Sequence, residues 1–276
     1  MKKIFKLRIN SSVVLLTLIL LSSCTKKKEP IKTESKLNSV CVEYSNLING
    51  YKVTAIWKPV SVVRSMVVGP AIIEFRNPKD SIVFNVTIDC FAIDAKKVHF
   101  SCDKDSVNVT KFNQQNITLL YEEKNHESDE NFGNTNEAFF FQDVDFDNVK
   151  ELIMREFANG QRWCSTFKVH KLNKDGQCEN ALSDITFDEP FILLDQMSKI
   201  DYVNKRIEIY SSGGSCSNET KVYRIDDEAT ASYGKTKMMV EFIKVDKYNS
   251  DEGKCYEETY RIIDGSKVFE SQKENI

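Results

Sequence analysis

Histidine and closely spaced cysteines are scarce in this sequence. Its 276 residues include three histidines, His99, His126 and His170, on separate segments, and no two cysteines stand in a C-x2-C or C-x4-C arrangement. Structural zinc sites are commonly built from such pairs, so this scarcity argues against a zinc site and against a histidine-rich metal centre. Five prolines and ten glycines are likewise too few for a collagen-like or low-complexity chain.

An excess of positive charge is also missing. The chain has 38 Lys and Arg against 41 Asp and Glu, and four of the cations lie in the N-terminal leader described below. Without that leader, 34 cations face 41 acids, a net charge of −7. This balance argues against a nucleic-acid partner, because phosphate backbones are bound by basic surfaces. The hydrophobic share of 41% is enough to bury a core.

No apolar run is long enough to span a membrane. The longest, Val13–Leu21, is far shorter than the roughly 20 residues that a membrane-crossing helix needs. Because a cationic start precedes it, the run predicts a signal peptide. Its end, Leu21-Ser22-Ser23-Cys24, resembles a bacterial lipobox. We therefore expect that residues 1–23 are removed and that Cys24 is lipidated. Residues 24–38 would form a flexible tether. The protein would be anchored by its lipid in the bacterial cell envelope, at the outer membrane facing the periplasm.

The remaining cysteines fit an exported protein, but their number is odd. Once Cys24 is set aside, seven are left, so they cannot all pair within the chain. Their order allows three disulfides between neighbouring segments and leaves Cys41 free, although sequence alone does not determine the connectivity. The candidate pairs are Cys90 with Cys102, Cys164 with Cys178, and Cys216 with Cys255.

Short alternating or β-branched runs recur along the whole chain, and each fits a strand better than a helix. Turn pairs such as Asn49-Gly50 and Asp264-Gly265 separate them and supply the positive φ that tight hairpins need. The sequence therefore predicts an all-β protein of antiparallel strands. The acidic polar stretch 122–137 is expected to be a solvated loop between a sandwich-like N-terminal part, 39–121, and a C-terminal part, 138–276.

Alternating acids follow the apolar run Phe139–Phe141. They present several hard oxygens along one tight loop, which is the donor set that calcium prefers. Asn148 stands where such loops favour Gly, and Asn tolerates the left-handed conformation required there. The flanking runs are strands, so an EF-hand is the wrong comparison. The alternative is that the acids only decorate a solvated turn. The predicted calcium ligands are Asp143, Asp145, Asp147, the carbonyl of Val149, and Glu151.

This segment resembles the FG-GAP type of calcium loop found in integrin-like propellers, with the pattern D-x-D/N-x-D-G-x-x-D-L. Asn148 and Glu151 depart from the Gly and Asp of that pattern. From about Phe139 to Ile263 the layout of strands resembles a bacterial lipoprotein family that carries one such loop. Its best understood members are periplasmic immunity proteins that block a lysozyme-like effector of a type IV secretion system. The resemblance implies a propeller-like C-terminal part around a calcium loop.

We therefore expect a membrane-tethered, non-enzymatic protein that binds a protein partner, and we suspect a secreted peptidoglycan hydrolase. A net charge of −7 would suit a cationic partner. The alternatives are a glycan-binding or structural envelope lipoprotein and, third, a hydrolase with an unrecognised carboxylate pair. The predicted partner-binding loop comprises Ser212, Gly213, Gly214 and Ser215. The alternative is that these residues form a plain hairpin end without a binding role. Bulky residues at Gly213 and Gly214 are expected to abolish inhibition while leaving the melting temperature nearly unchanged.

Overall fold

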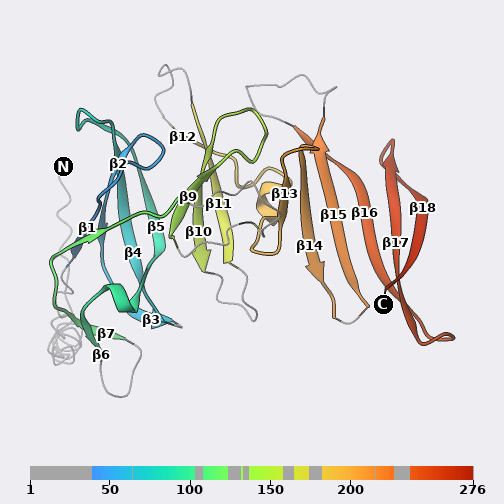
Figure 1. Cartoon of the computed structure of the whole chain (residues 1–276), viewed down its shortest axis with the longest axis horizontal. Coiled ribbons are helices and arrows are strands. Elements are labelled where there is room, and N and C mark those ends of the chain that lie inside the picture. The colour runs from blue at the N-terminus through green and yellow to red at the C-terminus, as the bar shows by residue number, and fades with distance from the viewer. Residues whose placement is uncertain are drawn as a thin grey trace, which may run out of the picture. The chain divides into compact units, whose positions relative to one another are not determined.

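The computed structural model describes most of the chain after residue 38 (Figure 1). The chain divides into two units, 1–36 and Leu37–Ile276. The predicted signal peptide, Cys24 and tether all lie outside the described residues. Among the helices of the described part, none is long and apolar enough to cross a membrane. The described residues are 39–63, 65–102, 108–123, 132, 137–157, 165–173, 182–214, 216–226 and 237–275.

The described residues form β-strands with two short 3-10 turns, η1 (Ala95–Lys97) and η2 (Phe191–Leu193). The pairing is antiparallel throughout the described sheets except between β1 and β8, which run parallel. The predicted all-β, antiparallel fold class is thus confirmed. The strands build three larger sheets and one small two-stranded one, β6 (Phe100–Cys102) with β7 (Val109–Phe112).

The N-terminal sheet has the order β3-β4-β2-β1-β8, with β5 paired to β4. Alternation explains how its strands bury one face: in β2, Val53, Ala55 and Trp57 are buried while the residues between them are not. Its strands are β1 (Val40–Tyr44), β2 (Lys52–Trp57), β3 (Ser61–Val63), β4 (Met66–Arg76), β5 (Ile82–Asp94) and β8 (Asn116–Leu119).

The second sheet has the order β12-β11-β10-β9, so each strand pairs with its neighbour in sequence. Every residue of β9 is buried, which explains why Phe139, Phe140 and Phe141 are apolar at successive positions instead of alternating. Its strands are β9 (Phe139–Gln142), β10 (Glu151–Phe157), β11 (Ser165–Leu172) and β12 (Leu182–Asp184).

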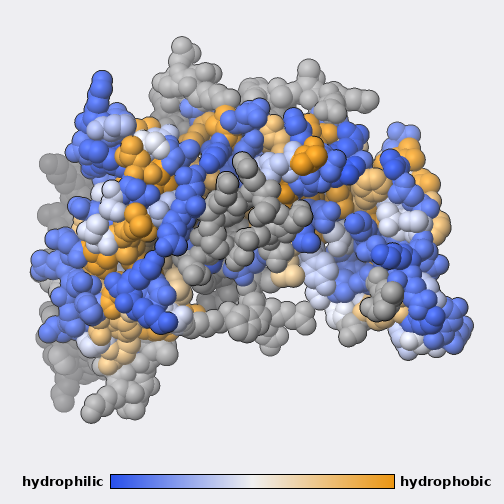
Figure 2. Space-filling view, viewed as in Figure 1, coloured by the Kyte–Doolittle hydropathy of each residue, from blue (hydrophilic) through white to orange (hydrophobic). Residues whose placement is uncertain are grey.

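The third sheet is also a meander in sequence order (Figure 1). Its last strand carries exposed side chains, and hydrophilic residues predominate on the visible surface of this sheet (Figure 2). The strands are β13 (Lys199–Asp201), β14 (Arg206–Ser212), β15 (Asn218–Ile225), β16 (Met238–Asn249), β17 (Lys254–Ile263) and β18 (Ser266–Asn275).

Aromatic rings join the N-terminal sheet to the second sheet. The ring of Phe139 lies 5.4 Å from that of Phe75 and 5.6 Å from that of Tyr44, and Phe141 stacks on Tyr51 at 6.1 Å. The core therefore continues from the strands before the polar stretch 122–137 into the strands after it.

Part of that stretch, 124–131 and 133–136, lies outside the described residues. Phe132, the described residue between these gaps, is only 2% exposed, whereas a solvated loop was expected. Its ring packs against Phe140 and Phe167, and its backbone N–H donates to the Ser198 carbonyl. One aromatic residue thus anchors a segment whose composition is otherwise that of a surface loop.

The cysteine pairing matches the expectation in part. Cys216 and Cys255 form a disulfide with Cα atoms 5.6 Å apart, and Cys41 has a free thiol. The considered pair of Cys90 and Cys102 is not formed, because Cys102 is a free thiol on β6 of the small sheet. Cys164 and Cys178 lie outside the described residues.

Candidate metal centre

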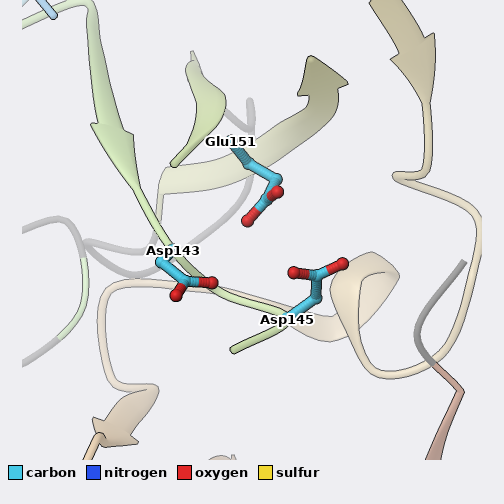
Figure 3. Close-up of side chains that lie close together, drawn as sticks. All are labelled: Asp143, Asp145 and Glu151. Atoms are coloured by element: carbon cyan, nitrogen blue, oxygen red, sulfur yellow. The ribbon is translucent and has the colours of Figure 1, made fainter. Parts of the chain in front are cut away.

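The predicted calcium loop connects β9 to β10. The two strands are antiparallel with Gln142 opposite Glu151, so Asp143 leaves the end of one strand beside the start of the other. Asp145 comes from the loop between them. Figure 3 shows the carboxylates of Asp143, Asp145 and Glu151 turned toward one another, and one oxygen of each lies within 4.8 Å of the others.

Side-chain to backbone hydrogen bonds shape the loop. Asp143 accepts from the N–H of Asn148 at 2.9 Å, and Asp147 accepts from the N–H of Val149 at 2.8 Å. Such bonds stabilise tight turns, because Asp side chains can replace backbone acceptors. Asn148 has φ +66°, which confirms the expected left-handed conformation. Phe146 has φ +60°, an uncommon value for a bulky residue, and its ring is buried beside that of Tyr202.

The carboxylates are unusually buried. Only 1% of Asp145 and none of Glu151 is exposed, and acidic residues are almost never buried so completely without partners. Glu151 Oε2 accepts from the N–H of Val144 at 2.9 Å, whereas Glu151 Oε1 and Asp143 Oδ1 are buried without a hydrogen-bond partner. These two oxygens fit a ligand that carries positive charge.

Burial also alters the acidity of the site. It raises the pKa of Glu151 to about 8, helped by the negative charge of Asp145, and it raises the pKa of Asp143 above its usual value. The cause is the loss of water around an ionised carboxylate, which favours the neutral form. A bound cation would oppose this effect by stabilising the ionised form.

A lysine from the neighbouring strand also enters the site. Lys171, near the end of β11, forms a short ion pair with Asp145 and a second ion pair with Asp147 at 3.0 Å. Burial lowers its pKa, but the hydrogen bonds to these two carboxylates outweigh burial and raise it overall. Sequence reasoning missed Lys171, because its position at the site depends on the pairing of β11 with β10.

The structure thus brings together three of the predicted ligands, Asp143, Asp145 and Glu151. Asp147 lies outside this group of three and contacts Lys171. Val149 follows it in the loop, with its N–H bonded to Asp147.

Gln142 is a further polar residue that sequence reasoning missed. It is 5% exposed and lies directly opposite Glu151, so both side chains project from the same face of the sheet. Gln142 Nε2 donates to the hydroxyl of Tyr202 at 2.7 Å, while Gln142 Oε1 is buried without a hydrogen-bond partner. Its place immediately before Asp143 was the only signal in the sequence.

The predicted partner-binding loop connects β14 to β15. Gly213 and Ser217 close it with a backbone hydrogen bond of 2.9 Å, and Cys216 fixes it to β17 through Cys255. A Cβ atom on Gly213 would overlap the backbone oxygen of Ser217, and Gly214 has φ +111°. The expectation that bulky residues at these glycines leave the melting temperature unchanged is therefore wrong. Ser212 is exposed, and Ser215 lies outside the described residues.

No protein-family model and no curated protein matches the chain. A solved structure described as "Structure of a Xanthomonas Type IV Secretion System related protein" is similar to it, with a TM-score of 0.52 and 10% sequence identity. The similarity covers 86% of this chain and 96% of that one. At this identity the comparison shows a shared fold.

Proposed function

We propose that this protein is a calcium-stabilised binding protein of the bacterial cell envelope, without enzymatic activity, whose partner is a secreted peptidoglycan hydrolase. The observation that carries the proposal is the convergence of three carboxylates, two of them with buried oxygens that lack a hydrogen-bond partner. Such oxygens are costly to bury and become favourable once they bind a cation.

Calcium fits these donors better than a transition metal would. Every candidate ligand offers oxygen, and calcium accepts six to eight oxygens in flexible geometry. Asp143, Asp145 and Glu151 would supply carboxylates, and the Val149 carbonyl remains the ligand expected from the loop pattern. Because the ion would join the end of β9 to the start of β10, its role would be to stabilise this hairpin within the core.

Calcium titration with thermal unfolding tests this role. Calcium added after chelation should raise the melting temperature, because a ligand at about a hundredfold excess over Kd adds about 2.7 kcal/mol. Asp145→Asn should weaken the response, whereas Asp251→Asn, in the exposed β16–β17 turn, should not. Identical melting curves with calcium and with chelator would exclude a stabilising calcium site.

The envelope location rests on the predicted lipobox and on the fold shared with a secretion-related protein. We propose that Cys24 carries the lipid. Intact mass of the membrane-extracted protein should show loss of residues 1–23 and addition of acyl chains. Cys24→Ala should leave the membrane fraction, and a variant that stays there would refute the lipid anchor.

The similar Xanthomonas protein is related to a type IV secretion system, and we extend this relation to the present chain by proposing a secreted partner. This proposal is also supported by the net charge of −7, which favours a basic partner, and by the disulfide that pins the exposed loop after β14. A rigid loop loses little entropy on binding, so it can enter a cleft at low cost.

Pull-down from bacterial secretions followed by a peptidoglycan-hydrolysis assay tests the partner. Ser212→Arg should abolish inhibition, because the long side chain would keep the loop out of a narrow cleft. The close contact between Gly213 and Ser217 would be unchanged. The matched control is Ser266→Arg, at the exposed start of β18 in the same sheet. Binding to purified peptidoglycan without inhibition of any hydrolase would instead favour a glycan-binding or structural role.

A further inference from the structure

The Lys171 ammonium binds a carboxylate that a metal cation at this site would also use. It contacts Asp145, one of the three converging carboxylates, and Asp147, the other aspartate of the loop. Its side chain is 13% exposed and that of Asp145 is 2% exposed, so water screens this pair poorly. Two cations that share one buried carboxylate repel each other strongly at such short range.

We propose that Lys171 is a tethered competitor of calcium, so that calcium binds by displacing its ammonium from Asp145 and Asp147. This inference rests on the proposed calcium site. The lysine partly neutralises the loop when calcium is scarce, which keeps the fold intact, and it lowers the affinity for calcium because the ion must break two ion pairs. The calcium Kd would then be higher than that of the same carboxylates without the lysine.

The side chain has the properties that displacement requires. Lysine carries its charge on a flexible four-carbon stem, so the ammonium can move several ångströms without a change in the backbone. Lys171 is the penultimate residue of β11 and retains some exposure, so its ammonium has a route to water. Asp145 would exchange an ammonium for a divalent ion of higher charge, and Asp147 would give up its ion pair with Lys171 beside that ion.

Isothermal titration with calcium chloride on the full mature chain provides the test. Lys171→Met should lower the calcium Kd by about tenfold or more, since losing a competing ion pair of about 1.4 kcal/mol has that effect. Without calcium, the same variant should melt at a lower temperature than the wild type. Lys171→Arg should retain the low affinity, because it keeps the charge.

Lys150→Met is the matched control. Lys150 precedes Glu151 in sequence but pairs with the exposed Glu123 at 3.1 Å, so its removal deletes the same charge beside the loop without freeing the loop carboxylates. Its calcium Kd should stay within about twofold of the wild-type value, as expected for an exposed pair.

Amine labelling of the wild type gives a second readout that needs no substitution. Calcium should increase the acetylation of Lys171, measured by mass spectrometry, and leave that of Lys150 unchanged. A wild type that binds calcium while Lys171→Met binds no more tightly and Lys171 labelling is unaltered would overturn the competition. Absence of calcium binding in the wild type and in every variant would overturn the calcium site itself.

Discussion

Glu151 is the residue at which burial and charge conflict most. It is fully buried, one of its oxygens accepts from Val144, and the other has no hydrogen-bond partner. Gln142, directly across the ladder, has the same property at its Oε1. Two buried oxygens without a hydrogen-bond partner thus lie on one face of adjacent strands, and the proposed cation would satisfy the charge of Glu151 there.

His170 gives the fold a dependence on pH. It is half-buried on β11 opposite Asp184. Burial lowers its pKa and outweighs the attraction of Asp184, while Lys168 lowers it further. The folded state thus favours the neutral ring, so the resulting stability is complete above the unfolded pKa of about 6.5 and is lost as pH falls below it toward the folded pKa.

Denaturant unfolding in chelator between pH 7.5 and 5 measures this dependence. Glu151, whose pKa is raised to about 8, takes up a proton in the folded state and adds stability as the pH falls over this interval. The His170 contribution is therefore the difference between two proteins: acidification should favour the fold of His170→Gln more than that of the wild type. His99→Gln, at an exposed position on another segment, should follow the wild type. A His170→Gln curve parallel to that of the wild type would assign the pH dependence to other groups.

At the scale of elements, the disulfide fixes the β14–β15 loop to the β16–β17 hairpin. Cys216 and Cys255 are 39 residues apart in sequence, and the two intervening strands, β15 and β16, pair with each other with a register shift between Val222 and Tyr223. The third sheet extends from the core into β17 and β18, whose side chains are largely exposed or only partly buried. The disulfide therefore stabilises the part of the third sheet that buries the least apolar surface.

Removal of the disulfide should destabilise this sheet. Chain-entropy arguments for a loop of this length give a loss of about 4 kcal/mol for Cys216→Ser with Cys255→Ser. Cys41→Ser, which removes a free thiol, should cost much less. Urea unfolding measures the difference, and equal stabilities would show that the cross-link does not contribute to folding.

At the scale of the whole molecule, the first two sheets share one core. Phe139 contacts Tyr44, Phe75 and Tyr121, all from the segment before the polar stretch. Sheets that share aromatic contacts of this kind are expected to unfold together, since neither can lose its partner without exposing the rings.

Denaturant unfolding should therefore show a single transition. A Trp163→Phe variant leaves Trp57, fully buried in the N-terminal sheet, as the fluorescence probe, and circular dichroism reports all strands. The two midpoints should coincide. Phe139→Ala should lower the free energy of unfolding by about 3–5 kcal/mol, as expected for a buried aromatic, and should shift the fluorescence and circular dichroism midpoints together. Separate midpoints would show two independent folding units.

The sequence by itself determined the features that depend on near neighbours. Alternation and turn pairs identified the strands, and the spacing of Asp143, Asp145 and Asp147 with Asn148 identified the loop between β9 and β10. These follow from interactions between residues a few positions apart, such as the bond from the N–H of Val149 to Asp147. The Cys216–Cys255 pair was one of three that the sequence suggested without determining the connectivity, and the structure confirms it.

Only the tertiary structure decided which groups share the site. Strand pairing places Gln142 opposite Glu151 and brings β11 with Lys171 against β10, while Asp147 stays outside the group of three carboxylates. The burial of Phe132 is likewise set by distant segments, since its ring packs against Phe167 and its N–H donates to the Ser198 carbonyl. A shift of one residue in register would turn each side chain to the other face of the sheet, and the register is fixed by the burial of one face of the paired strands together with the turn that joins them.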